Sequence, residues 1–268
     1  MPFTKANNTI KKLLLILILL PTTGFSLNSQ LKAIIILGEG DNLSDKQEDI
    51  TYMENIRLFL NEKNVLVKTF YDNEVKWEDI VEEAKDASIL IYQGHGIEWK
   101  KGYGGFDLKK NVSSEDIVRD LKLKSNAVVL FQSVCGGAGS SAGDDIDIGL
   151  EEAKKRILSY SDPFFKIGAK AYFAINTTGG VMDFLIAFFR SESIQQIFNN
   201  SVGHFYEKEI DIRYDKGKYI GIASSNWGGT TTRTTWYNGK KTIEEVPSIK
   251  NYSIAYIANP DYNINYIK

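Results

Sequence analysis

The sequence predicts an α/β fold of three layers, in which helices cover both faces of a mostly parallel central sheet. Short apolar runs rich in β-branched residues alternate along the chain with segments whose apolar residues recur at helical spacing. Strands buried on both faces of a parallel sheet are typically continuous apolar runs, and their alternation with helices favours this architecture. Beyond Lys218 the pattern changes to short strands and turns, so short C-terminal strands are expected to complete the fold.

Each element is predicted from its pattern. Apolar runs predict buried strands over Ala33–Leu37, Val65–Tyr71, Ser88–Tyr92, Asn126–Phe131 and Ala169–Ile175. Helical spacing predicts helices over Gln47–Glu62, Trp77–Lys85, from Ser113 or Ser114 onward, from Ile148 to about Leu158, and, as the longest, from Val181 to about Phe198. The shorter C-terminal strands are expected at Tyr219–Ala223, Thr230–Tyr237 and Ser253–Ile257, with a hairpin turn at Asn238-Gly239.

Length and composition favour one folded domain. The chain has 268 residues, of which 43% are hydrophobic and 25% charged, and its formal net charge is -2. That balance is typical of a globular protein and excludes the large basic field of a nucleic-acid binder. We expect the main domain to cover residues 27–215 and the strand-rich residues 216–268 to extend the same domain.

The first 26 residues have the layout of a signal peptide. Lys11 and Lys12 precede an unbroken apolar run, Leu13 to Leu20, and small residues follow, with cleavage expected near Gly24 or Ser26. The apolar run is much shorter than the roughly 20 residues of a membrane span, so no stable span is expected. The pattern predicts a secreted or periplasmic protein.

Cys135 is the single cysteine of the chain. An exported protein with one cysteine has no intrachain disulfide, so the thiol needs another explanation. It is a buried inert side chain, an intermolecular bridge or a nucleophile.

His95 and Cys135 are expected at one edge of the sheet. His95 lies in a glycine-rich loop after the third predicted strand, and Cys135 lies in a second such loop after the fourth. Functional groups of open α/β sheets collect at the carboxyl ends of the strands. An imidazole there can take the proton of the thiol, and the Gly96 and Cys135 amides can stabilise an oxyanion. The pattern therefore predicts acyl-transfer chemistry without a cofactor.

Two sequence blocks make this prediction more specific. Tyr-Gln-Gly-His-Gly at Tyr92–Gly96 and Val-Val-Leu-Phe-Gln-Ser-Val-Cys-Gly-Gly at Val128–Gly137 resemble the signature blocks of the caspase, gingipain, legumain and metacaspase superfamily. The resemblance covers roughly residues 33–200 and implies a caspase-like fold. It also implies an endopeptidase in which Cys135 is the nucleophile, His95 the acid/base and Gly96 an oxyanion-hole donor.

The match to caspases themselves is partial. Ser133 and Val134 stand where the caspase pattern has Gln and Ala, and His95 lies 40 residues before Cys135 rather than about 50. These departures argue against a close caspase and leave the broader superfamily in place.

The family likeness also implies a specificity pocket near the cysteine. Asp144, Asp145 and Asp147 are the acidic candidates for binding a substrate Arg or Lys, although the same residues fit a solvated loop or a calcium site. Trp227 is a candidate pocket wall or a core residue. A protein or peptide is the expected partner, and the sequence predicts no oligomeric state.

Two alternatives stay open. One is an exported binding module that keeps the fold without activity and uses Thr230–Trp236 as its contact surface. The other is a glutaminase-like amidohydrolase whose histidine follows the cysteine. His204 with Glu207 fits that spacing poorly, because the expected separation from histidine to glutamate is two residues and not three.

Overall fold

The computed structural model describes residues 30–38, 43–71, 75–99, 102–177, 179–203, 206–214, 217–225, 230–237 and 240–268. The expected signal peptide, the candidate pocket residue Trp227, the alternative histidine His204 and the expected turn at Asn238-Gly239 lie outside these residues.

Within the described residues, eight strands form one mixed sheet in the order β2-β1-β3-β6-β7-β12-β9-β8. The first five strands of that order are mutually parallel, and the last three run antiparallel to their neighbours. Their bounds are β1 Lys32–Leu37, β2 Leu66–Phe70, β3 Ala87–Gln93, β6 Leu123–Gln132, β7 Ala171–Ile175, β8 Tyr206–Tyr214, β9 Lys218–Ser225 and β12 Asn251–Ala258. The predicted mostly parallel sheet is confirmed.

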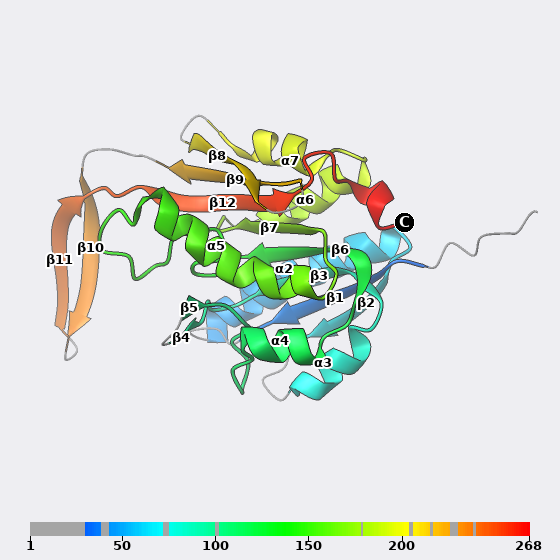
Figure 1. The fold of residues 1–268 in the computed structure, drawn as a ribbon. Coiled ribbons are helices and arrows are strands. Elements are labelled where there is room, and N and C mark those ends of the chain that lie inside the picture. The colour runs from blue at the N-terminus through cyan, green and yellow to red at the C-terminus, as the bar shows by residue number, and fades with distance from the viewer. Residues whose placement is uncertain are drawn as a thin grey trace, which may run out of the picture.

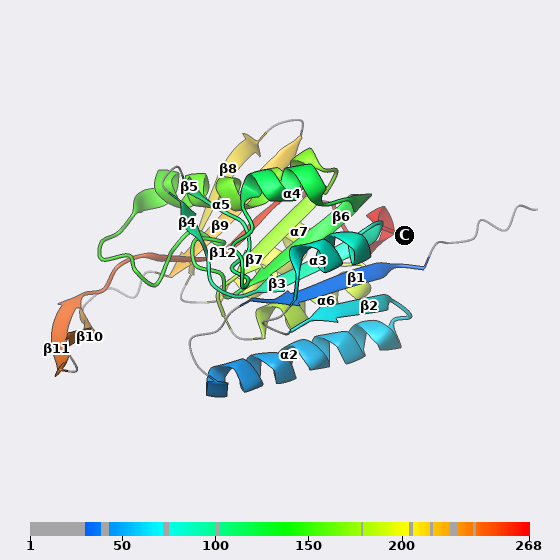
Figure 2. The same ribbon diagram turned by 90° about the horizontal axis from the view of Figure 1, so that it is seen from below.

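Helices cover both faces of this sheet (Figures 1 and 2). The helices α3 Trp77–Glu83, α4 Ser114–Asp120 and α5 Gly149–Lys166 pack on one face. The helices α2 Leu43–Glu62, α6 Gly180–Phe189 and α7 Ile194–Ser201 pack on the other. The predicted three-layer α/β fold is therefore confirmed, and none of the described helices is long and apolar enough to cross a membrane.

The strand β6 illustrates why apolar runs form the central strands. Val129 and Phe131 face the α3, α4 and α5 layer, whereas Val128 and Leu130 face the α2, α6 and α7 layer. Successive side chains of a strand point to opposite faces, so a strand covered on both sides must be apolar throughout. The residues Val128 to Phe131 are at most 1% exposed.

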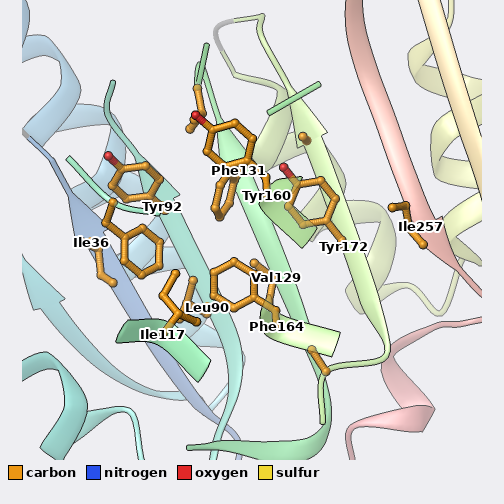
Figure 3. Packing of buried hydrophobic residues seen from close by; sticks show 14 of the residues in the cluster. Ile36, Leu90, Tyr92, Ile117, Val129, Phe131, Tyr160, Phe164, Tyr172 and Ile257 are labelled. Carbon is orange, nitrogen blue, oxygen red and sulfur yellow. The ribbon is translucent and has the colours of Figure 1, made fainter. Parts of the chain in front are cut away.

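The ring of Phe131 lies at the centre of the core between the sheet and the helices α3, α4 and α5 (Figure 3). It lies edge-on to Tyr92, Tyr160 and Tyr172, with centroid distances of 5.4, 5.7 and 5.2 Å. It also contacts Phe164 at 5.9 Å. Edge-to-face packing of this kind is favourable, and here it fixes aromatic rings that arrive from two strands and one helix.

The helix predicted from Val181 to Phe198 is two helices. α6 ends at Phe189, and Ser191 then adopts a left-handed backbone with φ 68°. Ser193 and Gln196 form a reciprocal capping box that begins α7. The prediction of one long helix was wrong, because the helical spacing of apolar residues continues across the break between α6 and α7. The longest described helix is instead α2.

The C-terminal strands divide between two places. β9 and β12 join the main sheet, whereas β10 Thr230–Tyr237 and β11 Lys240–Pro247 pair only with each other among the described strands. This β10–β11 arm projects from the body at the end where β4 Glu98–Trp99 and β5 Gly102–Tyr103 lie (Figures 1 and 2). The base of the arm is thus close to the carboxyl ends of the parallel strands.

Candidate active site

The loops of His95 and Cys135 leave the same edge of the sheet. β3 and β6 are adjacent and parallel, and their last residues, Gln93 and Gln132, are register partners. His95 lies two residues beyond the end of β3 and Cys135 three residues beyond the end of β6. Both side chains are half-buried, so each is partly accessible to solvent.

The backbones of these two loops touch at Gly96. A Cβ atom at this position would overlap the carbonyl oxygen of Cys135 and would lie 2.6 Å from the Tyr160 hydroxyl oxygen. Only glycine permits so close an approach. The amides of Gly96 and Cys135 donate no hydrogen bond to another group of the described chain.

Ser133, two residues before Cys135, is held in an unusual backbone conformation. Ser133 has φ 54°, in the left-handed region, and its amide donates to the Ile175 carbonyl at 2.9 Å. Next to it, the Gln132 side chain donates to the Thr177 carbonyl at 2.6 Å and accepts from the Val181 amide at 3.0 Å. Backbone strain of this kind persists where surrounding contacts enforce it, and it is common at active sites. Here β7 and α6 enforce it.

Three buried tyrosines hold the carbonyl groups of the two loops. The hydroxyl of Tyr92 donates to the His95 carbonyl at 3.0 Å, and that of Tyr160 to the Ile97 carbonyl at 3.3 Å. The Tyr172 hydroxyl donates to the Gly137 carbonyl at 2.9 Å. Burial raises the pKa of each phenol, so all three remain donors across the ordinary pH range.

Arg156 of α5 ties the two loops together. Its guanidinium forms an ion pair with Asp144 at 2.8 Å and donates to the Gly139 carbonyl at 3.3 Å, both in the cysteine loop. The same group stacks over the ring of Tyr103, 4.7 Å from its centroid, in the loop that follows His95. A planar guanidinium can make these contacts at once, which an ammonium cannot.

A cavity of about 710 Å³ opens beside the thiol. It lies between the end of β7, the cysteine loop and the base of the β10–β11 arm. Its lining residues are Ser133, Cys135, Ser140, Ser141, Ala142, Asp144, Asn176, Thr230, Ser248, Ile249, Lys250 and Asn251. The volume is within the range of ligand-binding cavities.

The acidic candidates for a basic-residue pocket differ in their positions. Asp144 lines the cavity, but its carboxylate is engaged by Arg156 and by the Ser141 amide at 2.7 Å. Asp145 and Asp147 are exposed and do not line the cavity, and Asp147 accepts a hydrogen bond from the Gly149 amide at 2.9 Å. Among the described residues, no group of three or more His, Cys, Asp or Glu side chains is arranged to hold a metal ion.

Sequence reasoning missed the residues that support the site. A partial signal exists for Tyr92 and Tyr172, because each places a hydroxyl inside a buried apolar strand, and a buried hydroxyl requires a partner. Arg156 carries no such signal. It lies among charged residues of an amphipathic helix, and only the fold shows that it is 6% exposed.

No model of a known protein family matches this chain, and a search of curated proteins finds none with significant sequence similarity.

Proposed function

We propose that the protein is an exported cysteine endopeptidase of the caspase-like type, with Cys135 as the nucleophile and His95 as the acid/base. The observation that supports this most strongly is the close approach of Gly96 to the Cys135 carbonyl. It joins the loop of the only cysteine to the loop of a histidine at the carboxyl edge of adjacent parallel strands. Cys135 itself also lines a cavity of about 710 Å³.

The chemistry follows from these groups. The Cys135 sulfur attacks the carbonyl carbon of the scissile bond while His95 takes the thiol proton. The resulting oxyanion accepts hydrogen bonds from the Gly96 and Cys135 amides, each worth about 3 to 4 kcal/mol in the transition state. The C–N bond breaks as His95 gives its proton to the leaving amine. Water, deprotonated by His95, then hydrolyses the thioester and regenerates the thiol.

The test is hydrolysis of a mixed set of short peptides by the purified protein, compared with its Cys135→Ala and His95→Ala variants. We expect cleavage by the parent alone, because both side chains take part in the chemistry. Ser159→Ala is a suitable control, since this hydroxyl on α5 donates to the Lys155 carbonyl and does not line the cavity.

Equal cleavage by Cys135→Ala would exclude the thiol as nucleophile. A complete lack of cleavage by the parent would favour the alternative of an exported binding module, for which the exposed β10–β11 arm would be the contact surface.

A further inference from the structure

Within the described residues, the β10–β11 arm is a sheet of two strands. Each strand therefore pairs along one side and presents the backbone N–H and C=O groups of its other side at an open edge. Both strands are eight residues long, so each open edge extends over roughly 26 Å. Figures 1 and 2 show the arm projecting away from the main sheet.

The register of the arm shows which residues face the open edges. Tyr237 and Lys240 are partners, and partners joined by a two-residue connection form a hydrogen-bonded pair. Hydrogen-bonded and non-hydrogen-bonded pairs alternate along antiparallel strands, so Thr234 and Ile243 form a non-hydrogen-bonded pair. The backbone N–H and C=O groups of Thr234 therefore point to the open edge of β10, and those of Ile243 point to the open edge of β11.

Pro247 supports this assignment independently. It is the partner of Thr230, and the alternation that begins at Tyr237 makes this pair a non-hydrogen-bonded one as well. A proline has no N–H to donate to the ladder, so within a sheet it is confined to such outward-facing positions. Thr230 also lines the cavity beside Cys135. The outward-facing backbone groups of β10 thus begin at the cavity.

The two open edges differ in chemistry. β11 contains two lysines, two glutamates and a proline, whereas β10 contains five threonines and one arginine. Proteins protect an open edge from pairing with another strand by charged side chains, lysine above all, and by proline. β11 has these features. β10 has neither lysine nor proline, and threonine favours extended backbone. The open edge of β10 is therefore the one suited to accept another strand.

We infer that the open edge of β10 binds an extended segment of a polypeptide substrate by strand pairing, on the N-terminal side of the scissile bond and outside the cavity. The inference rests on the proposed peptidase function. β10 begins at the cavity and runs away from it toward the end of the arm. A substrate strand antiparallel to β10 runs toward the cavity, so its C-terminal end reaches Cys135.

Antiparallel pairing is favoured because it is more stable per residue than parallel pairing. Main-chain hydrogen bonds supply the affinity in this mode of recognition. The partner is thus defined by its extended conformation and its length, whereas short peptides that end at the cavity do not reach the arm.

The experiment uses the full chain and three peptides with the same residues around the scissile bond. One peptide is about eight residues long, and each of the others adds the same Thr- and Ser-rich extension of about ten residues, at its N-terminal or its C-terminal end. We expect the N-terminal extension to lower KM roughly tenfold, the equivalent of one or two hydrogen bonds. kcat should change little, because the added binding is the same in the ground state and the transition state. The C-terminal extension should give no such gain.

A pair of proline variants separates the two edges of the arm. Thr234→Pro removes an outward-facing N–H from β10 and should abolish the gain. Ile243→Pro is the matched control, since this residue is the register partner of Thr234 and its N–H points to the opposite edge, and it should retain the gain. Cleavage of the short peptide should equal that of the parent in both variants. Replacing residues 232–245 by a short Gly-Ser linker should also abolish the gain.

Absence of a gain, an equal gain from both extensions, a gain that persists in Thr234→Pro, or its loss in both proline variants would overturn the inference and leave the peptidase proposal standing. A dimer of the parent that Thr234→Pro dissociates, seen by light scattering without any gain from the extension, would identify a second copy as the occupant of the edge and would also overturn it. Failure of the parent to cleave even the short peptide above the Cys135→Ala background would overturn the peptidase proposal and the inference with it.

Discussion

At the scale of single residues, the site depends on groups that reach across from neighbouring elements. Arg156 contacts Asp144 and Gly139 of the cysteine loop and Tyr103 of the histidine loop. Its role in the proposed reaction is positioning, since it holds both loops without lining the cavity.

The first prediction concerns the fork geometry of Arg156. Arg156→Ala leaves Asp144 buried without its partner and should lower the free energy of unfolding by about 3 to 5 kcal/mol, measured by urea denaturation. Arg156→Lys keeps the charge but not the fork. We expect it to fold while kcat for peptide cleavage falls by up to about 100-fold with little change in KM, because small displacements of reacting groups cost that much.

Arg119→Lys is the control for Arg156→Lys. The Arg119 side chain is 64% exposed and forms ion pairs with Asp116 and Asp120 on the surface. The control substitution should change neither stability nor kcat appreciably. An Arg156→Lys variant with the kcat of the parent would contradict a positioning role.

The second prediction concerns Gly96. Because a Cβ there would overlap the Cys135 carbonyl oxygen, Gly96→Ala must push the two loops apart. Peptide cleavage should fall by at least about 100-fold. Gly143→Ala is the matched control in the cysteine loop, since a Cβ there meets no atom within 4 Å. Similar activity of the two variants would show that the contact is unimportant.

At the scale of elements, sequence patterns predicted the strands better than the ends of helices. Continuous apolar runs identified β1, β3, β6 and β7, because both faces of these strands are covered. β8 was missed, since Tyr206–Tyr214 carries charged residues in alternation and lies at the edge of the sheet.

The sequence was enough to place the loops of His95 and Cys135 at the same edge of the sheet. The supporting hydroxyls and Arg156 could not, because their contacts arise only when distant segments pack.

The third prediction tests the start of α4. Ser113 and Asp116 form a capping box, and the hydrogen bond from Ser113 lowers the pKa of Asp116. Ser113→Ala should cost about 1 kcal/mol of unfolding free energy at neutral pH. A carboxylate with a lowered pKa stabilises the fold above its unfolded pKa, near 3.9, and loses that contribution as the pH falls through its folded pKa.

The difference between parent and Ser113→Ala should therefore begin to shrink as the pH falls below about 4, near the unfolded pKa, and should vanish below the lowered folded-state pKa of Asp116. Ser159→Ala is the control, because this mid-helix hydroxyl bonds only the Lys155 carbonyl, at 2.9 Å, among the described contacts. A difference that grows in acid would contradict the capping account.

At the scale of the whole molecule, the body and the β10–β11 arm are built differently. The body buries apolar side chains on both faces of the sheet, whereas the residues of the arm whose exposure is described are nearly all exposed and pair with no strand of the main sheet. Thr230, the first residue of β10, and Ser248, which directly follows β11, nevertheless line the cavity at the base of the arm.

The fourth prediction follows from that separation. Replacing residues 232–245 by a short Gly-Ser linker removes most of the arm and retains Thr230 and Ser248. We expect the melting temperature and the cleavage of short peptides to stay near those of the parent, because an isolated two-stranded hairpin adds little stability. A large fall in melting temperature would show that the arm belongs to the folding core.

If Cys135 is a nucleophile activated by His95, as we propose, its alkylation by iodoacetamide at pH 7 should show this directly. Cys135 is the only cysteine of the chain, so mass spectrometry of the labelled protein reports this site alone. We expect the folded parent to react several times faster than free cysteine and the His95→Ala variant to lose that advantage. Equal, slow rates in both proteins would contradict the proposed activation of Cys135 by His95.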